Sequence, residues 1–412
     1  NFIDANGFVD VPISKKSSLQ VAARKALSDF TETPTYNNFF ERISQDTEVE
    51  NNTMSITNSD KTFDFYDASL RWIYKINKNE ILRVNFINAT NELVFNENTT
   101  IDAIEDSRES SLSQHSIAGA ISYSKVWNTK WQTVFEAYET DYKLKSINAN
   151  LLDSQRFLQE NKISETSLKL KANHKFNGRF QLLSGYHFVE TKMTNLDDVD
   201  VPRFKLLVSE VVRTHGVFSQ LSYKSNDKNT NITSGIRYNY IDKFSKHLLE
   251  PRLSFSHKFL DFFSVEVLGE FKHQNSSQII NFQNDFLGIE KRRWQLSNDN
   301  DIPVIQSRQA SLGLSYSKNG WLVSAEGYYK KIKGITTQSQ GFQNQYEFVR
   351  TSGFNEVRGL DFIVRKRLNN FNSWLSYSFM NSDYTFSDLP EATFPSNYDI
   401  RHAITLGTNY TS

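Results

Sequence analysis

The stretch "NSWLSYSFMNSDYTF", residues 372–386, carries the pattern that decides the fold of this chain. Leu375, Tyr377 and Phe379 alternate with smaller or more polar residues such as Ser376, which is the two-residue period of a β-strand. In a soluble β-sandwich the apolar face of this strand would point into a core. In an outer-membrane barrel it would point to lipid, and the polar face would line a wet lumen. The remainder of the sequence distinguishes these two possibilities.

The composition fits a barrel better than a soluble core. Hydrophobic residues make up 38% of the 412-residue chain, while aromatic residues make up 14%, with 32 Phe and 18 Tyr. A large soluble core needs more aliphatic residues. A barrel does not, because half of each strand faces water and the lipid band is only about 25 Å tall. No stretch approaches the roughly 20 apolar residues of a transmembrane helix, so a helical membrane protein is excluded.

Charge and cysteine content exclude several other classes. The chain has 47 basic and 47 acidic residues, so no net field attracts nucleic acid. Cysteine is absent, which excludes disulfides, zinc knuckles and a cysteine nucleophile.

Short turns separate pairs of long period-two runs. Asn and Asp recur in these turns, often with Gly or Lys, because they tolerate the positive φ of a tight hairpin. Eight hairpins give sixteen strands, and "RHAITLGTNY" at 401–410 gives a seventeenth. The eight predicted turns are at 14–16, 77–79, 128–129, 177–178, 225–229, 260–261, 318–320 and 369–370.

Long polar connections alternate strictly with these turns. Bacterial outer-membrane barrels are built in this way, with short turns at the periplasmic end and long loops outside. The predicted strands also run to about 10–15 residues, longer than the roughly 5–6 of globular sheets. The predicted loops are at 31–62, 94–113, 146–161, 193–207, 275–306, 337–355 and 387–399.

Aromatic residues flank several turns, as the interfacial girdle of a membrane barrel requires. Tyr316 and Trp321 flank the turn at 318–320, and Trp127 and Trp131 flank the turn at 128–129. The pattern therefore favours an all-β transmembrane antiparallel barrel over a soluble β-sandwich. For residues 360–365 it predicts Leu360, Phe362 and Val364 toward lipid and Asp361, Ile363 and Arg365 toward the lumen.

Two blocks near the C-terminal end, and one near the start, resemble a known family. "FNEVRGLDFIVRKRLNNFNSWLSYSFMNSDYTF" (354–386) followed by "FPSNYDIRHAITLGTNY" (394–410) resembles the late strands of TonB-dependent outer-membrane receptors. The second block carries Pro395, Tyr398, Asp399, Arg401 and His402 in a P-x-x-Y-D-x-R-H pattern. "GFVDVPISKKSSLQVAARKALSDF" (7–30) resembles the first periplasmic hairpin of such receptors, particularly those of Bacteroidota.

The resemblance implies a 22-stranded barrel closed by a plug domain. It implies import of a scarce nutrient, such as an iron–siderophore complex, cobalamin, a glycan or a peptide, with energy from the inner-membrane TonB complex. The implied location is the bacterial outer membrane, and the implied partners are lipid, lipopolysaccharide, the nutrient ligand and TonB acting through the plug. The alternative is a passive porin-like or secretion-associated barrel with the same wall.

Nothing in the sequence indicates catalysis or a cofactor. There is no G-x-S-x-G, P-loop, H-E-x-x-H or G-x-G-x-x-G motif, and the eight histidines lack metal-ligand spacing. We therefore expect neither an enzyme nor a metal site. Charges predicted to face the lumen, which include Arg252, Lys258, Glu266 and Glu270, pair across strands, contact a plug or bind substrate.

Two connections are the candidate ligand-binding loops, because loops on a rigid barrel converge over its mouth. Each combines aromatic and cationic side chains, which suit an anionic planar ligand or a stacked sugar. Loop packing and lipopolysaccharide contact are the alternative roles. The candidates are Tyr36, Phe39, Phe40 and Arg42 in "TETPTYNNFFERI", and Lys291, Arg292, Arg293 and Trp294 in "FLGIEKRRWQL".

We also expect residues 1–412 to be one partial barrel domain. About seventeen strands are visible, whereas a single-chain bacterial barrel needs an even number to join its ends. An open edge in lipid costs several kcal/mol per unpaired backbone group. One strand and a plug are expected before residue 1, and about four strands after residue 412.

Overall fold

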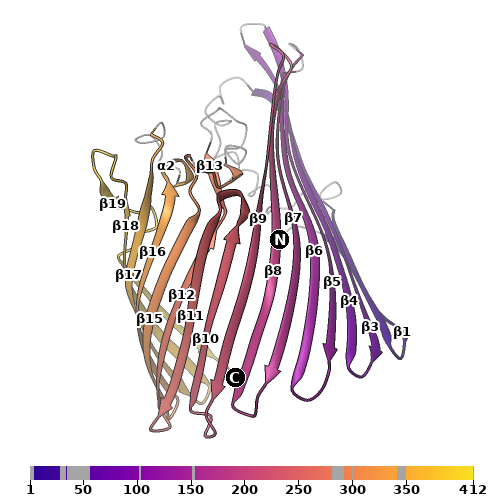
Figure 1. The fold of residues 1–412 in the computed structure, drawn as a ribbon. Coiled ribbons are helices and arrows are strands. Elements are labelled where there is room, and N and C mark those ends of the chain that lie inside the picture. The colour runs from indigo at the N-terminus through magenta and orange to yellow at the C-terminus, as the bar shows by residue number, and fades with distance from the viewer. Residues whose placement is uncertain are drawn as a thin grey trace.

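The computed structural model describes residues 4–27, 34, 56–101, 104–150, 154–280, 292–298, 300–340 and 349–411. Most of these residues belong to one 18-stranded antiparallel sheet, in which each long strand pairs with its neighbours along the chain. Figure 1 shows the strands side by side in a single curved wall, with the short turns gathered at one end. No helix among these residues is long and apolar enough to cross a membrane.

Seventeen long strands and one three-residue strand form the sheet, and the predicted strand order and all eight predicted turns are confirmed. The first nine are β1 (Asp4–Ser14), β2 (Ser17–Ala26), β3 (Ile56–Asn77), β4 (Glu80–Ile101), β5 (Ile104–Val126), β6 (Trp131–Asn150), β7 (Gln155–Lys175), β8 (Phe180–Val199) and β9 (Phe204–Lys224). The others are β10 (Thr230–Ile241), β11 (Lys246–Phe259), β12 (Phe263–Gln274), β15 (Ile305–Lys318), β16 (Trp321–Thr336), β17 (Ser352–Leu368), β18 (Phe371–Thr385), β19 (Thr393–Pro395) and β20 (His402–Tyr410).

Three smaller elements lie in the connections at the end of the wall opposite the turns. They are the two-stranded hairpin of β13 (Ser276–Ile280) and β14 (Arg292–Leu296), the short helix α2 (Thr337–Gln340) and the 3-10 turn η2 (Asp242–Phe244).

The two faces of the wall differ in polarity, because the cross-strand register keeps like residues together. Leu360 pairs with Phe379 and Phe362 with Tyr377, so the predicted lipid face is apolar on both strands. Asp361 pairs with Ser378 on the other face. That face also lines the cavity described below, so it is the concave, lumen side. The structure thus separates residues 360–365 between the two faces as predicted.

Aromatic pairs mark the turn end of the apolar face. Phe263 and Tyr316 are cross-strand neighbours with ring centroids 5.2 Å apart. The rings of Phe371 and Tyr410 lie 4.8 Å apart. Because aromatic rings favour the headgroup region, these pairs occupy the position predicted for one interfacial girdle.

The turns rely on short polar side chains. In the 225–229 turn the Asp227 carboxylate accepts hydrogen bonds from the Ser225 hydroxyl and from the Asn229 backbone N–H. These hydrogen bonds, that from Ser225 first, lower the pKa of Asp227. Sequence-local bonding of this kind is the reason why Asn, Asp and Ser predict turns.

The two Asn-Gly turns differ in conformation, which gives a testable contrast. Gly320 has φ +75°, and a Cβ at this position would lie 2.4 Å from the Arg367 carbonyl oxygen. A Cβ at Gly178 would meet nothing within 4 Å. We expect Gly320→Ala to lower the free energy of unfolding by about 1–2 kcal/mol or more and Gly178→Ala to leave it nearly unchanged. Urea unfolding of both variants in lipid vesicles measures this, and equal stabilities would contradict the turn geometry.

Several predicted loops are instead strand. β4 continues to Ile101 and β5 begins at Ile104, so most of 94–113 is paired. The connections at 146–161 and 193–207 are likewise mostly strand, and β3 begins at Ile56 within the predicted loop 31–62. The sequence signal fails here because polar residues dominate these extensions and their apolar residues, such as Phe95, follow no regular alternation. The backbone ladder holds them together without a regular apolar face.

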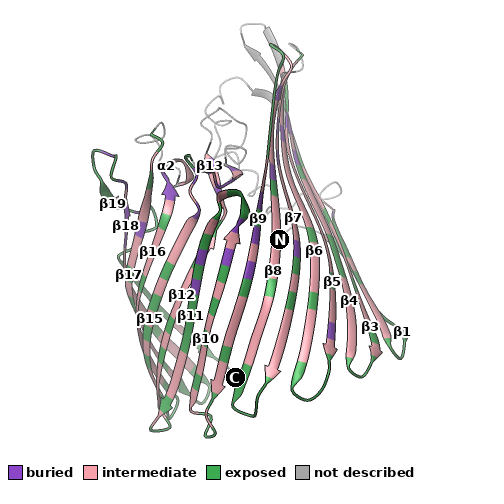
Figure 2. Ribbon diagram, viewed as in Figure 1, coloured by how far each residue is buried: buried purple, intermediate pink, exposed green. Residues whose placement is uncertain are grey.

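The sheet has two open edges within the described residues. β1 pairs only with β2, and β20 pairs only with β18. Buried side chains are few, and Figure 2 shows several of them near the junctions where β10 passes into β11 and β12 ends. This end of the wall is therefore where side chains pack together as they do in a core.

Candidate functional site

A row of polar side chains crosses the lumen face at one height. Cross-strand pairing places Arg252 of β11 opposite Glu270 of β12, Glu270 opposite Gln309 of β15, and Gln309 opposite Lys330 of β16. Since side chains of directly paired residues share a face, these groups form one continuous band on four strands. We call it the Arg252 row.

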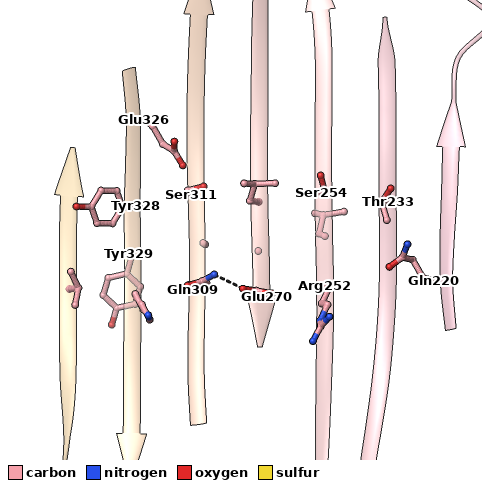
Figure 3. A pocket seen from close by; sticks show the side chains of 16 residues that line it. Gln220, Thr233, Arg252, Ser254, Glu270, Gln309, Ser311, Glu326, Tyr328 and Tyr329 are labelled. Atoms are coloured by element: carbon pink, nitrogen blue, oxygen red, sulfur yellow. Dashed lines mark hydrogen bonds between the residues drawn. The ribbon is translucent and has the colours of Figure 1, made fainter. Parts of the chain in front are cut away.

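The Arg252 row borders a cavity of about 560 Å³ on the lumen wall. Figure 3 shows Ser311, Ser254 and Thr233 one step along their strands from that row, and Tyr328 at a similar height. A second cavity of about 600 Å³ shares Glu270, Gln309 and Lys330 with the first and continues toward the loop end. Together they form one groove, the lumen groove, of the size that binds small ligands.

In the Arg252 row the carboxylate has polar partners, whereas the two cations have no carboxylate partner among the described residues. The Glu270 carboxylate accepts a hydrogen bond from Gln309 Nε2 at 2.5 Å and lies 2.7 Å from Lys272 Nζ. Among the described residues, no carboxylate lies within ion-pair distance of Arg252 or Lys330. The groove therefore presents two cations and several hydroxyl groups to whatever occupies the lumen.

Acidic groups lie deeper in the same wall. Glu326 of β16 is directly opposite Asp361 of β17 on the lumen face. Like charges directly opposite each other are unfavourable unless water or a cation separates them. No cluster of three or more His, Cys, Asp or Glu side chains suited to a metal ion occurs within the ranges that the structure describes.

The hairpin β13–β14 folds against the inner side of distant strands. Leu296 of β14 and Val304 pack with Met193, Val212, Ile241 and Leu248, in a buried cluster that joins β8, β9, β10 and β11. Trp294 packs against the same cluster, and α2 lies beside β13. We call residues 275–304 of this connection the strap, of which 275–280, 292–298 and 300–304 are described.

One buried ion pair fixes the strap to β8. Arg293 is 4% exposed, and its Nη1 and Nη2 donate to the two carboxylate oxygens of Asp197 at 3.1 and 2.6 Å. This is the two-pronged geometry in which guanidinium binds carboxylate most strongly. The amides of Asn161 and Asn195 each donate to the carbonyl oxygen of Trp294 at 3.2 Å.

The predicted ligand-binding residues are thus placed in different ways. Arg293 and Trp294 lie in β14 and contact β7 and β8, and the backbone of Arg292 lies in the same strand. Tyr36, Phe39, Phe40, Arg42 and Lys291 lie outside the described residues.

Sequence reasoning missed most of the lumen groove. It named Arg252 and Glu270 as lumen charges, and both line the groove. Gln309, Lys330 and Tyr328 were not singled out. Their signal is the period-two pattern continued to the polar face, but only the cross-strand register shows that they lie side by side.

The polar groove on one face and the apolar band on the other define the class of this protein, a β-barrel wall of the bacterial outer membrane. Its sequence matches the family described as TonB dependent receptor-like, beta-barrel, over residues 17–412. The chain therefore belongs to the TonB-dependent receptor family. Members of this family reside in the bacterial outer membrane, and they are transporters and not enzymes.

Solved structures share this fold at low sequence identity. The RagAB peptide transporter superposes with a TM-score of 0.59 and 10% identity over 94% of this chain. A mutant of the ferric enterobactin receptor PfeA from Pseudomonas aeruginosa gives 0.61 and 11% over 99%, and the copper transporter OprC gives 0.64 and 10% over 99%. The chain spans 51%, 70% and 64% of these proteins, respectively. No curated protein sequence matches the chain.

Proposed function

We propose that this chain is the wall of an outer-membrane receptor that imports a scarce nutrient with energy from the TonB complex. The observation that carries the proposal is the lumen groove, in which Arg252 and Lys330 face the lumen without a carboxylate partner among the described residues.

The proposed partners follow from the open edges and from the family. Edge strands cannot remain unpaired in lipid, because each unpaired backbone group costs several kcal/mol. We propose that further strands complete a barrel of twenty-two strands. We also propose that a plug domain fills the lumen and transmits the force exerted by TonB. Outer-membrane lipid and lipopolysaccharide surround the apolar face.

The proposed substrate is an iron–siderophore complex, cobalamin, a glycan or a peptide. Related folds include a peptide transporter, a ferric enterobactin receptor and a copper transporter by name, and this range supports import of a nutrient. An anionic ligand fits the two free cations of the groove best.

We further propose that the two candidate loops take part in ligand recognition. Tyr36, Phe39, Phe40 and Arg42 belong to one loop, and Lys291, Arg292, Arg293 and Trp294 belong to the other. Arg293 is buried, so its part is to hold the strap in place. Replacing Tyr36, Phe39 and Phe40 together by Ala tests the first loop without changing any residue of the strap, and unchanged ligand affinity would remove this loop from the proposal.

Uptake by the intact receptor tests the function. Cells that carry the full-length gene are compared with cells that lack it, each with and without functional TonB, for uptake of the four ligand classes. We expect uptake of one class that requires both the receptor and TonB. Uptake that persists without TonB, together with ohmic conductance in planar bilayers, would instead identify a passive porin.

The lumen groove gives a sharper prediction. We expect Arg252→Ala and Lys330→Ala each to weaken binding of an anionic ligand about tenfold, because a hydrogen bond to a charged group contributes about 1.5–3 kcal/mol. Arg179→Ala, in the turn at 176–179, is the control and should bind normally. Titration of ligand into purified receptor measures this. Normal binding by the Arg252→Ala, Lys330→Ala double variant would remove the groove from the site.

A further inference from the structure

Three cations gather on the outward face of β15 and β16, above the apolar band. Arg308 is directly opposite Lys331, and Gln306 is directly opposite Lys333. Below them on the same face lie Ala310 with Tyr329 and then Leu312 with Gly327. Like charges directly opposite each other on neighbouring strands are destabilising. The Lys331 ammonium lies 3.9 Å from the centroid of the Phe354 ring on β17, so an anion beside Arg308 would offset the charge that is left on β15.

Nearby carboxylates compensate this charge only on one side. On β17, Glu356 lies 3.4 Å from Lys331 Nζ and 3.7 Å from Arg358 Nη2, and it accepts a hydrogen bond of 2.5 Å from the Tyr329 hydroxyl. Asp383 is opposite Glu356 on β18. Arg308 is exposed, and the only aromatic or charged group that it contacts within the described residues is the ring of Phe271, 4.9 Å away. The β15 side therefore keeps its positive charge.

Three cations at a similar level elsewhere on the outward face form ion pairs. Arg213 lies 2.5 Å from Glu190, Lys143 lies 2.8 Å from Glu160, and Lys162 lies 3.4 Å from Asp141. On β6–β9 each of these three cations thus has a carboxylate of its own. Lys331 likewise has Glu356 at 3.4 Å, whereas Arg308 and Lys333 have no carboxylate within ion-pair distance among the described residues.

The level of the cluster along the membrane normal indicates which anion would lie beside Arg308. Ten residues separate Trp321, beside the periplasmic turn, from Lys331, which is about 34 Å of strand or a rise of roughly 26 Å at a tilt of about 40°. The apolar band of an outer-membrane barrel is about 25 Å tall. Lys331 and Arg308 therefore lie at the level of the outer-leaflet headgroups.

We propose that Arg308, Lys331 and Lys333 bind a phosphate group of lipid A, the lipid anchor of lipopolysaccharide. Guanidinium and ammonium groups are the usual protein ligands of phosphate, and basic pockets at membrane surfaces bind lipid headgroups in this way. Phe271 and the Leu312 side chain give an apolar surface beside the cations for the acyl chains. The site rests on the outer-membrane location of the wall and is independent of what the receptor imports.

Lipid binding by the purified, delipidated full-length receptor tests the proposal. The probes are bisphosphorylated lipid A, the same lipid without its phosphates, and inorganic phosphate, each followed by native mass spectrometry. We expect the Arg308→Ala, Lys331→Ala double variant to bind bisphosphorylated lipid A about ten- to thirtyfold more weakly. The charge-conserving Arg308→Lys, Lys331→Arg variant should retain binding, and this shows that a loss does not come from misfolding.

Two matched controls locate the effect. Lys366 lies on the same face at the periplasmic end, 4.6 Å from the ring of Trp321, and Lys162 is the paired cation on β7. Neither Lys366→Ala nor Lys162→Ala should change lipid A binding. The proposal is overturned by normal binding in the double variant, by an equal loss in Lys366→Ala, by equal binding of the phosphate-free lipid, or by displacement of lipid A by an equal concentration of inorganic phosphate.

Discussion

Phe362→Arg is expected to lower the free energy of unfolding by about 2–4 kcal/mol, whereas Ile363→Arg is expected to cost far less. The two positions are adjacent on β17 but lie on opposite faces. Phe362 is directly opposite Ala325 and Tyr377, within the apolar band. Ile363 is opposite Ser324 and Ser376, on the wet lumen face. A guanidinium at 362 must be buried in hydrocarbon, while one at 363 stays hydrated.

Reversible urea unfolding in lipid vesicles measures both variants against the parent protein. Phe362→Leu is the control, because it keeps the site apolar and should cost much less than Phe362→Arg. If both arginine variants lost the same stability, the assignment of faces along β17 would be wrong.

Arg293→Ala should release the strap from the wall. Removing one partner of a buried ion pair typically costs about 3–5 kcal/mol, because the other charge is left buried without compensation. The side chain of Asp197 is 17% exposed, so little water can replace the lost guanidinium. The cost is local, since the strands of the wall hold each other through their own ladders. We therefore expect faster amide hydrogen exchange at 276–280 and 292–296, and little change in β8.

The controls separate the buried pair from surface charge. Arg203 pairs with Asp198 at 2.9 Å and Asp200 at 2.8 Å, but it is 61% exposed, so Arg203→Ala should cost at most about 1 kcal/mol. The Arg293→Met, Asp197→Leu double variant removes both charges and should exchange more slowly than Arg293→Ala. Unchanged hydrogen exchange in the strap of Arg293→Ala would show that the Arg293–Asp197 ion pair does not hold the strap against β8.

The strap also bears on how loss of ligand binding is interpreted. Simultaneous substitution of Arg292, Arg293 and Trp294 by Ala would remove the packing of Trp294 against the buried cluster together with any direct contact to ligand. Loss of binding in that variant would not distinguish the two. Comparison with Arg293→Ala alone, whose effect on the strap is measured by exchange, separates them.

The sequence by itself determined the strands, the turns and the two faces. A period of two places Leu375, Tyr377 and Phe379 on one side whatever the neighbours are, because successive side chains of a strand point to opposite faces. Turns such as Asn319–Gly320 join consecutive strands, so they also determine which strands pair. Local chemistry was sufficient for these features.

The tertiary structure alone decided where the strands end above the lipid and where the strap lies. It also decided which side chains on neighbouring strands lie at the same level of the wall. A mostly polar run such as 94–113 carries no regular alternation of apolar residues, so its pairing depends on the ladder to its neighbours. The Arg252 row and the position of Arg308 opposite Lys331 depend on register between strands. Arg293 meets Asp197 across 96 residues, because packing in the barrel mouth brings together segments that no local pattern relates.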